Sequence, residues 1–307
     1  MSLPTNTARN APLDPAGSVS VARPRPFYWS VRRELWENRS IYLAPLAVAV
    51  VVLLGFLINA SHLVRTHGLL ALHIPNDSSP IEQPYAIAAV LIILCGLLVG
   101  VFYCLDALHG ERRDRSILFW RSLPVGDVTA VLSKASIPLV VLPLVIFGAI
   151  VVTHLTMLLL NLAVLLVNGG NAAMLQPGTP LLELWLALLY ALFAIALWCA
   201  PVYGWLLLAS AWARRAALLW ASLPLIAVCI LEKIAFRTSY FAGFLRYRFW
   251  GWFAEALGSQ RPCCIPHPLA IVLPGRFLSA PGLWTGLAIA AVLLAGAARV
   301  RRYRGPI

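Results

Sequence analysis

The sequence predicts an all-α membrane protein with six transmembrane helices per chain. Its composition is the first reason: 61% of the 307 residues are hydrophobic, 12% are charged, and the mean hydropathy is +0.82. Soluble domains are about 45–50% apolar and about 25% charged. The second reason is that the charges cluster between long apolar runs, and about 20 apolar residues cross a bilayer. These observations exclude an ordinary soluble protein.

The net charge of +12 does not indicate nucleic-acid binding. The arginines lie mostly beside the ends of the apolar runs, where arginine sets topology and contacts lipid headgroups. The sequence offers no basic and aromatic stripe on a soluble domain that could bind a nucleic acid. We therefore expect the lipid membrane, and no nucleic acid, as the partner of this charge.

Residues 1–26 are predicted to form a disordered tail, because they are rich in Pro, Ala and Ser. They lack the roughly 7–15-residue apolar core of a signal peptide. Residues 27–40 have helical periodicity, with aromatic side chains on one arc and Arg33, Glu34 and Glu37 on the other. This pattern is typical of an interfacial amphipathic helix, although a plain extension of the first span stays open. The residues expected to contact the interface are Tyr28, Trp29, Arg32, Arg33 and Trp36.

Charged residues bound six apolar spans within a transmembrane domain covering 41–299. The third and fourth spans are long, and the fifth is short if it ends before Glu232. Proline residues inside the spans are expected to kink them; these are Pro138, Pro143, Pro201 and Pro224. The predicted spans are 41–60, 85–105, 135–166, 181–212, 216–231 and the stretch between Arg276 and Arg299.

Arginine placement predicts that both termini are cytoplasmic, with 300–307 as a short tail. Seventeen of the 24 lysine and arginine residues then lie on the cytoplasmic side. Six of the others run from Lys233 to Arg276, five of them in the extracytoplasmic segment 235–280, where the positive-inside rule weakens because the segment is long. This segment also crowds aromatic residues around Arg246 and Arg248. We expect it to form short helices that dip into the outer leaflet or cap the bundle.

The most charged stretch between the first and last spans is the loop 109–134, HGERRDRSILFWRSLPVGDVTAVLSK. Charged residues begin it, four large apolar residues follow, and Leu-Pro-Val-Gly at 123–126 ends the helical pattern. Asp127 is placed to cap the helix that continues through Lys134 into the third span. Large apolar residues beside water need a lipid or protein cover. We therefore expect a cytoplasmic coupling helix that a soluble partner pushes.

At these residues the chain resembles the permease subunits of ABC transporters of the type-two export class. The family signature has an acidic and basic start, a small hydroxyl residue, an apolar stretch, Leu-Pro with a small residue, and a lysine before the next span. Two departures are that Asp114-Arg115 replaces a small, glycine-containing pair, and that Phe119-Trp120 is bulkier than usual. The matching residues are Glu111, Arg112, Ser116, Leu118, Leu123, Pro124, Val125 and Lys134.

The resemblance implies a homodimer, or a heterodimer with a related permease, in the bacterial inner membrane. Two separate ABC ATPase subunits would dock on the loops and bind ATP and Mg²⁺, so this chain would hold no cofactor and would not be catalytic by itself. In agreement, the sequence has no G-x-x-x-x-G-K-[ST] run. The implied ATPase-coupling residues are Glu111, Arg112, Arg113, Asp114, Ser116, Leu118, Phe119, Trp120, Leu123 and Pro124.

Cargo would be hydrophobic or amphipathic, and two polar residues of the third span are candidates for its path. His154 and Asn161 lie on nearly one helix face, and polar groups at membrane depth usually turn into the bundle. Interhelical hydrogen bonding is the alternative role. The histidine and cysteine spacings do not indicate a metal site.

Two other function classes stay open. The chain could be a non-transporting assembly or sensory subunit that uses the same ATPase. It could also be a secondary transporter, although the sequence lacks the internal repeat typical of that class. A membrane enzyme is the remaining class, although the sequence has no serine elbow and no H-E-x-x-H motif.

Overall fold

The computed structural model describes residues 26–67, 82–114, 126–167, 181–257 and 274–303. Every regular element in these ranges is a helix, and six of the helices are long and apolar enough to cross a membrane. This confirms the predicted helical class and the number of membrane-length helices. Residues 1–25 and 304–307 and the apolar half of the loop 109–134 lie outside the described residues. The predicted C-terminal tail begins later than expected, because residues 300–303 form the last turn of the sixth long helix.

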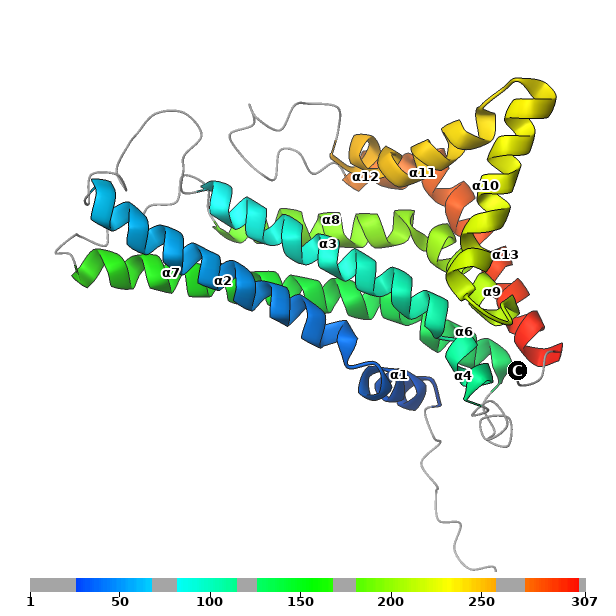
Figure 1. Ribbon diagram of the computed structural model, residues 1–307, viewed down its shortest axis with the longest axis horizontal. Coiled ribbons are helices and arrows are strands. Elements are labelled where there is room, and N and C mark those ends of the chain that lie inside the picture. The colour runs from blue at the N-terminus through cyan, green and yellow to red at the C-terminus, as the bar shows by residue number, and fades with distance from the viewer. Residues whose placement is uncertain (1–25, 68–81, 115–125, 168–180, 258–273, 304–307) are drawn as a thin grey trace, which may run out of the picture.

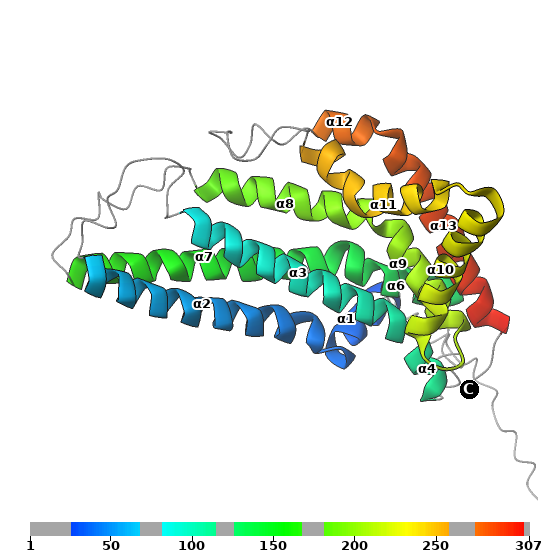
Figure 2. The same cartoon turned by 45° about the horizontal axis from the view of Figure 1, so that its top comes forward.

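Long helices lie side by side along the main axis of the molecule (Figures 1 and 2). Their shared core is built from aliphatic side chains such as Ile92, Ile146 and Ile150, which are almost fully buried. Their outward faces carry exposed Leu and Val, as expected where lipid replaces water. The helices are α2 (Ser40–His67), α3 (Glu82–Asp106), α7 (Leu142–Val167) and α8 (Leu181–Trp198).

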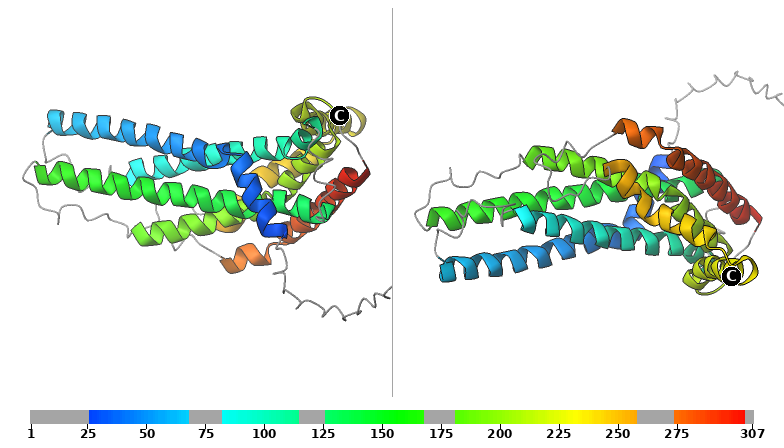
Figure 3. Two further views of the ribbon diagram at one scale, coloured as in Figure 1. Left: turned by 90° about the horizontal axis from the view of Figure 1, so that it is seen from below. Right: turned by 90° about the horizontal axis from the view of Figure 1, so that it is seen from above.

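The chain enters and leaves at the same end of the bundle. Figure 3 shows α1 crossing beneath the long helices at this end. We call this end the base. The elements that meet there are α1 (Pro26–Glu37), α4 (His109–Arg113), α6 (Asp127–Ser136) and the last turns of α9 (Ala200–Trp212) and α13 (Pro281–Tyr303).

Two of the four predicted proline kinks coincide with breaks in helical geometry. Pro138 lies in η2 (Ile137–Val141), a π-helical turn that joins α6 to α7. Pro201 begins α9 just after the break at Cys199 that separates α8 from α9. Proline accounts for both interruptions because its ring removes a backbone donor.

The fifth span is longer than predicted. Helix α10 (Ala217–Phe236) continues through Glu232 and Lys233 for 20 residues in total, so it reaches the length of a membrane span. Glu232 and Lys233 lie inside this helix and do not end it. The Glu232 side chain instead binds the residues that follow the next turn. Its carboxylate accepts hydrogen bonds from the backbone N–H groups of Tyr240 and Phe241, at 2.7 and 2.9 Å. These are the first residues of α11 (Tyr240–Leu257), which therefore receives its N-terminal cap from α10.

Helices α9 and α13 pack closely because small residues face one another. A Cβ atom at Gly204 would lie 3.3 Å from the Cβ of Leu293 and 3.4 Å from the carbonyl oxygen of Ala290. Neither neighbour can move without shifting α13 itself. Small residues allow this close approach between helices in a membrane.

We expect Gly204→Leu to destabilise the protein by about 1–3 kcal/mol, the usual cost of overpacking. The thermal unfolding midpoint in detergent micelles measures this. Gly55→Leu on α2 is the matched control, because no atom lies within 4 Å of a Cβ built there. Equal shifts for both variants would contradict the close packing of α9 on α13.

Candidate functional site: a buried ion network at the base

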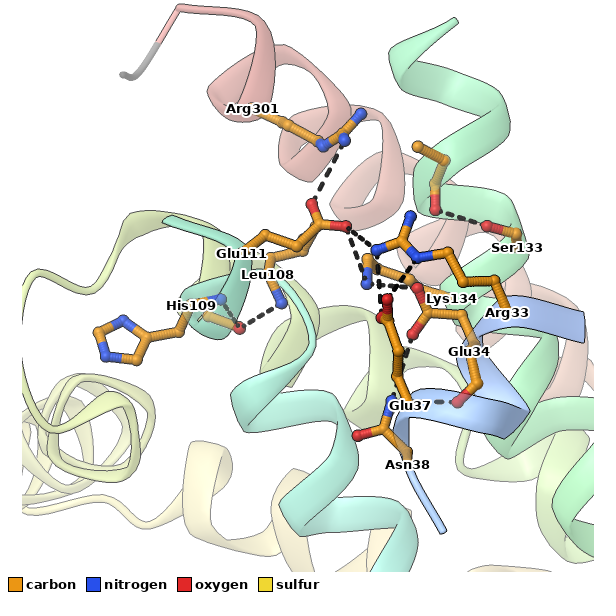
Figure 4. A network of polar contacts seen from close by, with 12 residues as sticks. Arg33, Glu34, Glu37, Asn38, Leu108, His109, Glu111, Ser133, Lys134 and Arg301 are labelled. Atoms are coloured by element: carbon orange, nitrogen blue, oxygen red, sulfur yellow. Dashed lines mark hydrogen bonds and ion pairs between the residues drawn. The ribbon is translucent and has the colours of Figure 1, made fainter. Parts of the chain in front are cut away.

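Lys134 of α6 connects two buried carboxylates that come from distant parts of the chain (Figure 4). Its Nζ donates to Glu34 Oε1 of α1 at 2.7 Å and lies 3.3 Å from Glu111 Oε1 of α4. The other oxygen of Glu34 accepts a hydrogen bond from the Tyr103 hydroxyl of α3 at 3.0 Å. All of these side chains are buried. Lys134 therefore links α1, α4 and α6, the short helices that lie next to the first three spans.

Glu111 continues the network to the C-terminal helix. Its Oε2 accepts from Arg301 Nη2 at 3.3 Å, and its Oε1 lies 3.5 Å from Arg33 Nη2. Arg301 in turn donates through Nη1 to Asp127 Oδ1 at 3.0 Å. The two described ends of the loop 109–134, α4 and α6, are thus bound to each other and to α13. We refer to Arg33, Glu34, Glu111, Asp127, Lys134 and Arg301 as the base network.

The buried charges of the base network are of both signs. Three carboxylates, Glu34, Glu111 and Asp127, face three cations, Arg33, Lys134 and Arg301, and Arg33 also pairs at 2.7 Å with the exposed Glu37. Removing a charge from water costs several kcal/mol, and close opposite charges offset that cost only when the geometry is good. The network therefore stabilises one relative arrangement of its helices more than it stabilises the fold as a whole.

Helix α4 is also fastened to the end of α9. Ser210 Oγ accepts hydrogen bonds from the backbone N–H groups of Leu108 and His109, at 3.1 and 2.9 Å. In the opposite direction, Arg112 Nη1 donates to the carbonyl oxygens of Ala211 and Ala213, at 2.8 and 3.1 Å. These contacts satisfy terminal backbone groups of both helices. They fix α4 against the fourth span.

Helix α1 turns a mixed apolar and charged side toward the bundle. Val31 and Leu35 pack against the main core there and Glu34 is only 3% exposed, whereas Trp29 and Trp36 on the opposite side are more than half exposed. Arg32 lies over both of these rings, with its Cζ 5.4 and 5.1 Å from their centroids. The predicted division between an aromatic and a charged side is seen only in part, because Val31 and Leu35, which lie on the arc of the aromatic residues, face the bundle beside Glu34, and Glu37 is exposed.

The predicted coupling residues divide into two groups. Glu111 and Arg112 are buried in the contacts described above, while Arg113 and Asp114 are exposed and pair with each other at 3.1 Å. The prediction that Asp127 caps α6 is wrong: Gly126 is the N-cap, and the Asp127 carboxylate accepts from Arg301. The remaining coupling residues lie outside the described residues; they are Ser116, Leu118, Phe119, Trp120, Leu123 and Pro124.

Sequence reasoning did not assign a site role to Glu34, Tyr103, Ser210 or Arg301. Tyr103 and Ser210 lie in apolar runs, and only the tertiary fold brings them to α1 and α4. Arg301 belongs to an arginine-rich end that any membrane helix can have. Only Glu34 could have been singled out from the sequence, because it lies on the predicted helix 27–40 and has no basic residue four positions away.

The predicted cargo-path residues His154 and Asn161 both contact Tyr85 of α3. His154 Nε2 lies 3.0 Å from the carbonyl oxygen of Tyr85, and Asn161 Nδ2 donates to the Tyr85 hydroxyl at 3.4 Å. The indole N–H of Trp185 on α8 donates to His154 Nδ1 at 3.2 Å. Because an indole only donates and a carbonyl only accepts, His154 is neutral with its proton on Nε2. Both polar side chains therefore make interhelical hydrogen bonds.

In the part of the chain that the structure describes, no group of three or more His, Cys, Asp or Glu side chains could hold a metal ion. Chemically, the base network can bind helices together and pass on displacement. Comparisons of the chain with protein-family models, with curated proteins and with solved structures gave no match.

Proposed function

We propose that this chain is the membrane-spanning permease subunit of an ABC exporter of the type-two class. It would couple ATP hydrolysis by separate subunits to outward movement of a hydrophobic or amphipathic cargo. The base network is the observation that supports this most strongly, because Glu111 and Lys134 are signature residues in the resemblance and are also the residues that join α4 to α6.

The base network suits a role in force transmission. The loop between α4 and α6 is attached at one side to α3 and at the other to the continuous α6–η2–α7 helix. Ser210 and Arg112 attach it to α9, and Arg301 attaches it to α13. A displacement of the loop therefore cannot stay local: it is passed to the second, third, fourth and sixth spans.

In this proposal the base faces the cytoplasm of a bacterial inner membrane, and α1 lies in the headgroup layer with its aromatic side toward lipid. Helices α11 and α12 (Pro274–Ser279) then form the extracytoplasmic element between the fifth and sixth spans. A second permease copy and two ATPase subunits, which carry ATP and Mg²⁺, complete the transporter. An assembly or sensory subunit that partners the same ATPase is the alternative function.

The test is to isolate the tagged chain from native membranes with its partners and to measure ATP hydrolysis and transport in vesicles. We expect an ABC ATPase to co-purify. Phe119→Glu and Pro124→Leu, in the loop 109–134, should leave the protein inserted but uncouple hydrolysis from transport. Tyr303→Glu is the control, because Tyr303 lies at the base end of α13 and is 72% exposed.

Unchanged coupling in both loop variants would refute the coupling role of the loop. An ATPase that binds the chain without cargo-stimulated hydrolysis would favour the assembly or sensory subunit. Flux driven by a proton gradient in vesicles that contain no ATPase would point to a secondary transporter.

A further inference from the structure

An apolar cavity of about 390 Å³ lies between α9, α10, α11 and α13. Its walls are almost entirely hydrocarbon and aromatic, and include Val202, Trp205, Leu225, Phe244 and Ile289. It is separate from the base network, since none of its lining residues takes part in that network. A cavity of this size and lining suits an alkyl chain.

Among the described residues that line this cavity, the one charged side chain is Arg248 of α11. Its side chain is 94% buried, given a relative exposure of 6%. The guanidinium donates through Nη1 to the carbonyl oxygen of Gly282 at 2.9 Å and lies over the Trp198 ring at 4.8 Å. Its Nε and Nη2 have no hydrogen-bond partner among the described residues.

Arg248 also has no carboxylate partner in the part of the chain that the structure describes. The acids at the two ends of α11 are engaged elsewhere: Glu232 caps the helix, and Glu255 contacts Tyr247 and Arg276. Burial lowers the pKa of the Arg248 guanidinium, but an arginine stays charged in a protein. A buried charge without a counter-ion is costly, so a specific anion is expected to bind near it.

We propose that this cavity is a binding site for an anionic amphiphile, with the alkyl chain among the apolar walls and a phosphate-type head group on Arg248. A guanidinium matches the oxygens of a phosphate through parallel N–H donors. In this conformation Arg248 Nε and Nη2 are closed to water. Binding of the head group therefore requires the guanidinium to turn toward the cavity. Binding neutralises the buried charge, and it requires no partner ATPase.

The apolar walls and the single charge together define the ligand class. A free anion would satisfy Arg248 but would leave the apolar walls uncovered. A neutral detergent or alcohol would fill the cavity but would leave the guanidinium unpaired. Only a molecule with both parts gains from both features, so affinity should depend on head group and chain together.

The test uses the purified chain in an uncharged detergent and measures thermal unfolding and native mass spectra. Three probes are titrated: dodecyl phosphate, dodecanol as the uncharged chain, and inorganic phosphate as the free head group. We expect dodecyl phosphate to bind one molecule per chain and to raise the unfolding midpoint with concentration. The other two probes should bind much more weakly.

Arg248→Gln should weaken dodecyl phosphate binding by about 10- to 100-fold, as expected for loss of a charge-assisted hydrogen bond. Arg246→Gln is the matched control, because Arg246 is exposed on the same helix and the change in charge is the same. Val202→Phe, which fills the cavity while keeping Arg248, should also weaken binding. Arg248→Lys should retain part of it.

Three results would overturn the proposal. The first is dodecyl phosphate binding in Arg248→Gln at the wild-type affinity. The second is an equal loss in Arg246→Gln, which would indicate non-specific attraction to surface charge. The third is inorganic phosphate binding as tightly as dodecyl phosphate. If Arg248→Gln does not fold, Val202→Phe decides the matter, because undiminished binding in that variant excludes the cavity as the site.

Discussion

Lys134→Met should destabilise the protein by about 3–5 kcal/mol, the cost of removing one partner from a buried ion pair. The lysine Nζ lies 2.7 Å from Glu34 and 3.3 Å from Glu111, and its side chain is almost fully enclosed. Without it, Glu34 stays buried beside the Tyr103 hydroxyl and the Asn38 amide, neither of which carries a compensating charge. The thermal unfolding midpoint in uncharged detergent measures the loss.

The chain provides its own control, because Lys233 is its only other lysine and is exposed on α10. Lys233→Met removes the same charge and should change stability by less than about 0.5 kcal/mol. Glu34→Gln combined with Lys134→Met should be less unstable than the sum of the single variants, because the uncompensated carboxylate is gone. Additive losses would mean that the two side chains do not interact in the folded protein.

The six spans could be predicted from sequence because a membrane helix is a local feature. A run of apolar residues satisfies its own backbone hydrogen bonds and needs no knowledge of its neighbours. The error at the fifth span has the same origin. Glu232 and Lys233 were treated as a boundary, but Glu232 serves the next helix, and that use depends on the turn at Arg237. A charged residue near the end of a span can therefore cap the next helix instead of lying at the membrane boundary.

The base network could not be predicted in the same way, because its members are brought together from positions far apart in the chain. Glu34 and Lys134 are 100 residues apart, and Glu111 and Arg301 are 190 apart. Helical periodicity grouped Glu34 with Arg33 and Glu37 opposite the aromatic arc, but the structure buries Glu34 beside Val31 and Leu35 and leaves Glu37 exposed. Periodicity does not say which side faces the bundle, since a helix at a membrane surface can bury its charges in protein and expose its aromatic residues to lipid.

Trp198 should be the side chain on which the position of α11 and α12 depends most. It is fully buried where α8 ends, it packs against Phe277 and Tyr247, and its indole N–H donates to the carbonyl oxygen of Arg248 at 2.9 Å. It belongs to a small core of its own with Ala194, Ala256, Phe277 and Leu283, separate from the main core of the long helices. Removing the indole therefore removes the centre of the core that holds these two helices to the bundle.

We expect Trp198→Ala to cost about 3–5 kcal/mol, as for other large buried aromatic residues. The loss should be local, because the main core does not include this residue. Hydrogen exchange should therefore accelerate in α11 and α12 and change little in α2, α3 and α7. Trp250→Ala on α11 is the matched control, since its ring is 74% exposed and its removal leaves no cavity. If hydrogen exchange in Trp198→Ala instead accelerates equally in all helices, the two cores unfold as one unit, and α11 and α12 are integral to the bundle.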